Sequence, residues 1–431
     1  MLLRFRASNH RSILEPVELS MIAVDEARAA TRGFGGLSER VLTVAGIYGP
    51  NASGKSNLLD AMAWLSIAVD TSLRGWDDYI PRDAHRFGKG PTTTSEFDLE
   101  LVVDGVRYEY RLEVDDSAVL FESLDSYPEK RRRNLFTRHE SHIDFRRSLD
   151  GTRGIRDLLT PTTLALSAAR RVSDSDFRRV GQVVASMRVL GLPRRKWWLR
   201  AFGGDVAFST LRLLFDAQGA NQPQLFDAPE DRPAVKDPGF VLDLIRFADP
   251  GVRDFVIGEE ESERFGGSRR QLRLVHQGEG EPVTLDLEDE SAGTQTWFRL
   301  IGPALAALRL GQVLLLDEID ASLHPRLSAR LIEIFQDPET NKRGAQLVFT
   351  SHDTSLLNGL NRDEVWLTEK APDATTQLVG LAEYGGERVR KSLNLERAYL
   401  QGRFGAVPEV DQIAVRRALG LSSEPRDGQA G

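Results

Sequence analysis

The stretch that decides the fold is Gly49-Pro50-Asn51-Ala52-Ser53-Gly54-Lys55-Ser56, which fits the pattern G-x-x-x-x-G-K-[ST]. An apolar, β-rich run at Val41–Tyr48 precedes it and predicts a strand buried on both faces, and a helical pattern follows to about Val69. A loop that wraps a polyphosphate needs backbone N–H groups at close range, which favours glycine, and a helix N-terminus adds partial positive charge. Lys55 supplies a charge for the terminal phosphates, and the Ser56 hydroxyl can bind Mg²⁺. The sequence therefore predicts a triphosphate site in a strand–loop–helix unit.

A second site is expected at Val313–Glu318, an apolar strand that ends in two acids. Such carboxylates lie at the carboxyl edge of a parallel sheet, where ligands bind in α/β folds. Asp317 is expected to hold Mg²⁺ through a water, and Glu318 is expected to polarise the attacking water as general base. A strand that ends in two solvated acids is common by itself. Together with the lysine-containing loop, it indicates hydrolysis of a nucleoside triphosphate.

Two further motifs lie on either side of this acidic strand. Glu290-Ser291-Ala292-Gly293-Thr294-Gln295 precedes a helix predicted from Ala292, and Phe349-Thr350-Ser351-His352-Asp353 ends the next strand. In this order the set resembles the ATP-binding-cassette (ABC) ATPases, and within them the SMC/RecF-like heads. In those proteins a signature of the form L-S-G-G-Q precedes the acidic strand, and a switch histidine follows it.

The resemblance implies a role for each residue that matches a motif. Ser291, Gly293 and Gln295 match the signature, and Ser291 and the backbone at Gly293 would bind the γ-phosphate held by a second subunit. Asp320 looks like the loop acid that crosses the dimer interface, and His352 looks like the γ-phosphate sensor. The cofactors implied are ATP and Mg²⁺, and the assembly implied is a head-to-tail homodimer or higher homo-oligomer.

The segment Asn9-His10-Arg11-Ser12-Ile13 resembles the N-F-R-S-I segment near the start of RecF-like heads. In those heads the arginine lies near the nucleotide, so the resemblance makes Arg11 a nucleotide-binding residue. His10 stands where the family pattern has phenylalanine. The glutamine loop that usually contacts Mg²⁺ has no counterpart that we can assign.

The C-terminal segment Lys391–Pro408 contains Y-L-Q-G-R-F-G-A-V-P. It looks like the ending of a group of bacterial AAA/ABC-like ATPases from abortive-infection and phage-defence modules, often encoded beside an RloB-like effector. The resemblance implies a sensor or gate that controls a separate effector protein. In the alternative interpretation, Tyr399, Leu400 and Phe404 simply pack a terminal helix onto the core.

The expected fold class is α/β: an ABC-type P-loop ATPase head, split in sequence, with a β-hairpin lobe and a mostly helical insertion. Residues 1–150 are expected to form its N-terminal half, with the P-loop and an antiparallel lobe in which Asp104-Gly105 predicts a hairpin. Residues 151–250 are assigned to the insertion, with one helix predicted over Asp174–Leu190. Residues 251–421 are assigned to the C-terminal half with the signature, the acidic strand and the switch histidine, and residues 422–431 to a disordered tail.

Composition limits the remaining possibilities. The chain has no cysteine, which excludes disulfides, thiolate metal sites and cysteine nucleophiles and fits a cytoplasmic location. Its longest apolar stretch, Ile301–Leu316, is interrupted by Arg309, so no membrane span is expected. The net charge of −8 restricts any nucleic-acid contact to a local patch such as Arg194–Arg200, which has adjacent tryptophans.

Other functions stay open at this point. The first alternative is a RecF/SMC-like DNA repair or maintenance ATPase, which would bind DNA tightly and with strong salt dependence. A self-contained toxin nuclease is the second, although the 79 residues after His352 are too few for a Toprim nuclease domain. A transporter subunit is disfavoured, because Ser56 and Ser291 are 235 residues apart and the signature is altered.

Overall fold

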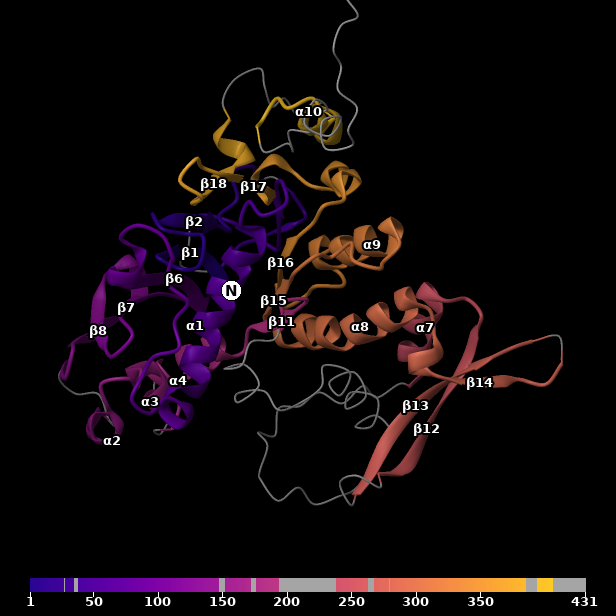
Figure 1. Cartoon of the computed structure of the whole chain (residues 1–431), viewed down its shortest axis with the longest axis horizontal. Helices are drawn as coiled ribbons and strands as arrows, with labels where there is room; N and C mark the ends of the chain where they lie inside the picture. Colours follow the sequence, from indigo (N-terminus) through magenta and orange to yellow (C-terminus); the bar gives the residue numbers. More distant parts are fainter. Residues whose placement is uncertain are drawn as a thin grey trace, which may run out of the picture.

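The computed structural model describes residues 1–26, 28–34, 38–146, 152–171, 176–193, 238–262, 267–278, 280–384 and 394–405. Figure 1 shows the N-terminal residues in an indigo-to-magenta lobe that includes α1, with the helices α8 and α9 on the other side of the strands β15 and β16. The described chain is therefore an α/β structure, as the sequence predicts.

A six-stranded sheet forms the centre of the described chain, in the strand order β11-β15-β16-β5-β17-β18. The first five strands are parallel, and β18 is antiparallel to β17. Strand β5, from the N-terminal part of the chain, lies between β16 and β17 from the C-terminal part, so the core is split in sequence as expected. The bounds are β5 Val44–Tyr48, β11 Arg188–Leu190, β15 Val313–Leu316, β16 Gln346–Thr350, β17 Val365–Lys370 and β18 Thr376–Gly380.

This core sheet is covered on both faces. Helix α1 (Lys55–Gly75) packs on one face, and α8 (Ala292–Leu310) and α9 (Pro325–Gln336) pack on the other. Successive residues of one strand point to opposite faces, so Leu315 lies in the apolar cluster with α1, while Leu314 lies in the cluster with α8 and α9. Parallel strands covered on both faces are apolar throughout, which accounts for the run at Val313–Leu316.

A seven-stranded antiparallel sheet, in the order β10-β9-β8-β7-β6-β1-β2, forms the N-terminal lobe. Its β6–β7 hairpin turns at Asp104 and Gly105, which have φ values of 49° and 79°. Positive φ at both turn residues is the geometry that favours Asp-Gly, so the predicted hairpin is confirmed. The bounds are β1 Leu2–Ser8, β2 Val17–Ser20, β6 Ser95–Val103, β7 Val106–Val114, β8 Val119–Tyr127, β9 Arg133–His139 and β10 His142–Phe145, beside a small pair of β3 Thr31–Arg32 and β4 Val41–Leu42.

The predicted insertion is helical in part, with α2 Thr152–Leu158, α3 Ala165–Ala169, α4 Asp176–Ala185 and α7 Pro238–Ala248. The helix predicted over Asp174–Leu190 is wrong at its end, because Arg188–Leu190 forms strand β11 and pairs in parallel with Leu314–Leu316 of β15. Pairing with the sheet edge overrides the local helical pattern there. Since α3 and α4 also pack on α1, this part of the insertion belongs to the core. The basic patch Arg194–Arg200 lies outside the described residues.

A separate three-stranded sheet, β12-β13-β14, precedes α8. Its strands are β12 Val252–Ser262, β13 Gly267–His276 and β14 Val283–Asp286, and β12 and β13 form a hairpin that extends away from α8 in Figure 1. Helix α7 packs against both β12 and α8, so it connects this sheet to the head. Near the chain's end, α10 (Leu395–Leu400) is described, whereas the predicted tail 422–431 lies outside the described residues.

Membrane insertion finds no support in the described helices. None of them combines the length and the apolar character that a bilayer span requires.

Candidate functional site

The predicted phosphate loop lies between β5 and α1, as expected. Gly54 is the N-cap of α1 with φ 106°, and a Cβ atom placed there would lie 2.0 Å from Oγ1 of Thr376. Gly49 has φ 152°, and its Cβ would lie 2.4 Å from the carbonyl oxygen of Thr368. Only glycine tolerates both the backbone conformation and the close neighbour at these two positions. The glycines of the motif are therefore required by the loop's own packing.

Two threonines from the last two strands of the core sheet form hydrogen bonds with this loop. Oγ of Ser53 and Oγ1 of Thr368 on β17 are 2.6 Å apart, and Oγ1 of Thr376 on β18 donates to the carbonyl oxygen of Ser53 at 2.8 Å. Thr376 Oγ1 also lies 2.6 Å from Oγ of Ser12. Neither threonine was predicted from the sequence, because both follow the loop by more than 300 residues and belong to no motif.

Lys55 is buried in the mouth of the loop, with 6% of its surface exposed. Its Nζ donates to the carbonyl oxygens of Gly49 at 2.8 Å and Pro50 at 3.0 Å. Burial lowers the pKa of the ammonium group, and the negative charges of Asp317, Glu318 and Asp320 oppose that shift. The lysine and the three acids are therefore close enough to interact. This agrees with the expectation that the loop after β5 and the acids after β15 meet at the carboxyl edge of the sheet.

The loop's donors suit a phosphate group. A buried ammonium group, backbone amides at a helix N-terminus and the half-buried Ser56 in the first turn of α1 combine positive charge with hydrogen-bond donors. Asn57, next to Ser56, donates through Nδ2 to Oγ of Ser12. That bond connects the first turn of α1 to the segment around Arg11.

The two acids after β15 share one hydroxyl group. Oγ1 of Thr350, at the end of β16, donates to Oδ1 of Asp317 at 2.6 Å and accepts from the amide of Glu318 at 2.8 Å. Asp317 is 7% exposed, whereas the Glu318 side chain is exposed. Glu318 also has φ 52°, a backbone conformation that is uncommon for a non-glycine residue and that clusters at functional sites.

Asp320 and the predicted switch histidine are in contact within one chain. Oδ1 of Asp320 accepts from Oγ of Ser351 at 2.8 Å and from the amide of His352 at 3.2 Å. The His352 side chain is exposed. Asp320 therefore fixes the backbone of the strand end from which His352 projects, a contact that the sequence did not predict.

The signature residues lie at the start of α8. Ser291 is the helix N-cap, and its Oγ accepts from the amide of Thr294 at 3.1 Å. Gln295 donates through Nε2 to the carbonyl oxygens of Glu288 at 3.0 Å and Glu290 at 2.9 Å. A Cβ on Gly293 would lie 3.1 Å from the carbonyl oxygen of Ser322. The signature thus packs against the loop that follows Asp320 in the same chain.

Arg11 lies beside α1, and the substitution at His10 has a structural explanation. His10 is fully buried, with Nε2 2.8 Å from Oδ1 of Asp60 on α1, and Nη1 of Arg11 lies 3.4 Å from Oδ2 of the same aspartate. Arg11 also lines a cavity of about 400 Å³ together with Ser12 and Asn57. A polar pair with Asp60 thus replaces the apolar contact of a phenylalanine, and it positions Arg11 at a cavity next to the phosphate loop.

The C-terminal motif is described in part, from Asn394 to Gly405. Tyr399 and Phe404 are buried, with 6% and 2% of their surfaces exposed, whereas Leu400 is 58% exposed. Helix α10 packs against the 3₁₀ helix η4 (Thr354–Gly359), which follows the switch histidine closely. Packing onto the core, the alternative reading of this motif, therefore accounts for Tyr399 and Phe404 but not for Leu400.

Comparison with known proteins agrees with these motifs. Residues 44–358, which run from β5 through η4, match the family described as "AAA domain, putative AbiEii toxin, Type IV TA system". The chain belongs to this family. The description names an AAA domain, so the chain is an ATPase of the general AAA type.

A solved structure is similar to the chain over most of its length. The structure described as "Crystal structure of the SmcHead bound to the C-winged helix domain of ScpA" is 13% identical in sequence, with a TM-score of 0.41, over 88% of this chain and 96% of that chain. No curated protein matches the chain.

Proposed function

We propose that this AAA-domain protein binds ATP with Mg²⁺ and hydrolyses it slowly at composite sites in a head-to-tail homodimer or higher homo-oligomer. One observation carries the proposal. Lys55 of the loop after β5 and the acids after β15 lie at the carboxyl edge of the core sheet, where the hydroxyl of Thr350 bonds both the Asp317 carboxylate and the backbone amide of Glu318.

Each residue at this edge has a distinct task in the proposed reaction. Lys55 exchanges its bonds to the loop carbonyls for the β- and γ-phosphate oxygens, and Ser56 and Asp317 hold the metal ion. Mg²⁺, when bound, neutralises charge on the phosphate oxygens. Glu318 accepts a proton from the attacking water, whose oxygen forms the new bond to phosphorus while ADP leaves. His352 contacts the γ-phosphate from the end of β16.

The signature residues are proposed to serve the nucleotide of the opposite subunit. In Figure 1 the beginning of α8 lies beside α7 and β14, and α1 lies on the other side of β15 and β16. Within one chain, the hydrogen bonds of Ser291 and Gln295 stay inside residues 288–299. A second copy placed head to tail would bring Ser291, Gly293 and Gln295 to the phosphates held by Lys55.

Two variants test the chemistry directly. Lys55→Ala removes the charge inside the phosphate loop and is expected to abolish ATP binding measured by calorimetry, whereas Lys342→Ala, at an exposed position, is expected to bind normally.

Glu318→Gln keeps the shape and loses the base, so it is expected to bind ATP, turn over far more slowly and accumulate as an ATP-trapped dimer on size exclusion. Glu339→Gln, also exposed, is the matched control. Normal turnover in Glu318→Gln would assign the base to another residue.

The biological role that we propose is that of a sensor or gate in a bacterial antiphage module, with a separate effector protein, such as an RloB-like one, under its control. The family description, which names an abortive-infection toxin, and the C-terminal Y-L-Q-G-R-F-G-A-V-P segment support it. Phage plating on cells that carry the gene with its neighbouring reading frame tests it, and Lys55→Ala is expected to remove protection. If the purified chain instead binds DNA tightly with a steep salt dependence, a DNA-maintenance role is favoured.

A further inference from the structure

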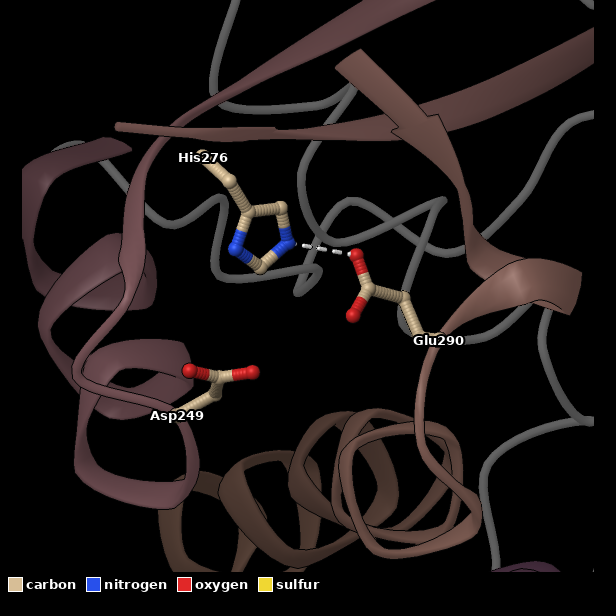
Figure 2. A group of neighbouring side chains, drawn as sticks. All are labelled: Asp249, His276 and Glu290. Carbon is tan, nitrogen blue, oxygen red and sulfur yellow. Dashed lines mark hydrogen bonds and ion pairs between the residues drawn. The ribbon is translucent and has the colours of Figure 1, made fainter. Parts of the chain in front are cut away.

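Three side chains that can bind metal ions meet next to the signature, and they come from three different elements. Asp249 follows α7, His276 ends β13, and Glu290 immediately precedes the N-cap Ser291. One ligand atom from each lies within 4.8 Å of those of the other two. Figure 2 shows the three side chains directed toward one shared space, with Nε2 of His276 2.7 Å from Oε1 of Glu290.

The cluster contains more acidic groups than basic ones. The Glu290 side chain is 4% exposed and that of His276 is 21% exposed, and Asp249 is half-buried, so two carboxylates share one imidazole. Arg246 on α7 donates to the carbonyl oxygens of Val252 and Arg253 and forms an ion pair with Asp243. A buried carboxylate is stabilised by a hydrogen-bonding or cationic partner, and a divalent ion bound here would serve both acids.

The surroundings hold the cluster open. The amide of Gly251 donates to Oδ1 of Asp249 at 2.9 Å, which orients that carboxylate. A Cβ on Gly251 would lie 3.1 Å from Oδ1 of Asp249 and 3.4 Å from Nδ1 of His276. Glycine therefore leaves the space beside both ligand atoms free, and a hydrogen bond to a ligating carboxylate is typical of metal sites.

We propose that Asp249, His276 and Glu290 bind a divalent transition metal ion, with Zn²⁺ as the ion that fits best. One imidazole and two carboxylates are ligands that Zn²⁺ accepts, and sites with three protein ligands keep a further position for water. Mg²⁺ and Ca²⁺ prefer oxygen-only ligand sets, so the histidine selects against them. This site is separate from the Mg²⁺ position proposed at Ser56 and Asp317.

The bound ion would add a direct link between three elements that so far meet through the packing of α7 on β12 and α8. It would join the end of α7 and the end of β13 to the residue that precedes Ser291. The N-cap of α8 would then be fixed to the β12–β14 sheet. A conformational change in that sheet would therefore be transmitted to the signature residues that begin at Ser291. This consequence for the ATPase rests on the proposed function, whereas the metal binding itself does not.

Metal titration of the full chain in the absence of nucleotide and Mg²⁺ tests the site. After dialysis against a chelator, calorimetry with Zn²⁺ is expected to give one more equivalent per chain in the wild type than in Asp249→Asn or Glu290→Gln. Asp243→Asn, on helix α7 just before Asp249 and paired with Arg246, is the matched control and is expected to match the wild type. Other surface sites, such as His142 and Asp144, contribute equally to every variant and cancel in the difference.

Cobalt gives an independent readout. Because the chain has no cysteine, a visible Co²⁺ band reports nitrogen and oxygen ligands without a thiolate background. Asp249→Asn leaves the His276–Glu290 bond in place and is expected to fold, as circular dichroism will show, while losing this band. Equal stoichiometry and equal spectra in the wild type and folded Asp249→Asn would overturn the proposal, and the cluster would be an ion pair only. That outcome would leave the proposed ATPase mechanism untouched.

Discussion

Oγ1 of Thr350 lies 2.6 Å from Oδ1 of Asp317 and donates to it. The same oxygen accepts from the amide of Glu318 at 2.8 Å, so the end of β16 orders both acids that follow β15. In the proposed mechanism Asp317 holds the metal ion, and a hydrogen bond of this kind would tune that ligand without touching the substrate. The strand between the phosphate loop and the acids thus has a chemical task as well as a structural one.

Replacing this hydroxyl is expected to slow the reaction. Thr350→Val keeps the volume and the β-branch but leaves Asp317 without its donor, and turnover is expected to fall by about 10–100-fold, with a higher Mg²⁺ requirement. Thr350→Ser retains the hydroxyl group and is expected to keep most of the activity. Steady-state ATPase assays across a Mg²⁺ titration measure both effects. Equal activity in the valine and serine variants would show that the Thr350 hydroxyl does not contribute to the proposed metal site.

The phosphate loop is expected to reject even one methyl group. Gly54→Ala would place a Cβ 2.0 Å from Oγ1 of Thr376 at a residue with φ 106°, so we expect a loss of stability of about 1–3 kcal/mol and strongly weakened ATP binding. Gly75→Ala, at the other end of α1, meets no atom within 4 Å and is expected to stabilise the helix by about 0.5–1 kcal/mol. Urea unfolding and calorimetry compare the two. An alanine tolerated at position 54 would contradict the loop geometry described above.

The shared site can be tested by mixing two inactive chains. Ser291→Arg obstructs the γ-phosphate position supplied to the partner, and Lys55→Ala disables the chain's own phosphate loop. In a mixed dimer one site carries both defects and the other carries neither, so ATPase activity is expected to return, provided one intact site can act alone. If Ser291 acts only as the N-cap seen here, Ser291→Arg costs about 1 kcal/mol of stability and keeps its turnover.

The buried pair His10–Asp60 is expected to contribute to stability. His10→Phe restores the residue of the family pattern and retains the ring contact with Phe97, but it removes a 2.8 Å contact from an aspartate that is 2% exposed. We expect a loss of about 1–3 kcal/mol in urea unfolding. A second variant, His10→Phe with Asp60→Leu, is expected to recover part of that loss. An unchanged midpoint for His10→Phe would show that the phenylalanine and histidine forms are equivalent here.

The sequence predicted those parts of the molecule that local chemistry determines. The loop 49–56, the acidic strand ending at Asp317 and the helix that starts after Ser291 each have a pattern of their own, and the structure places all three as expected. Thr350, Thr368 and Thr376 could not be predicted, because their contacts depend on strand order, and a lone threonine in a β-rich run has no distinguishing pattern. Strand β11 was missed for the same reason, since pairing with β15 determines its conformation.

The two threonines that contact the phosphate loop also make its packing depend on residues that are synthesised much later. Residues 49–56 leave the ribosome early, but Thr368 and Thr376, which fix Ser53 and crowd Gly54, are synthesised more than 300 residues later. Strand β5 likewise lacks both of its neighbours, β16 and β17, until then. Contacts between such distant parts of a chain form late in folding. A chain cut before β18 would therefore carry the whole loop sequence without Thr376 and its bond to Ser53, and we expect its phosphate loop to lose the packing described above.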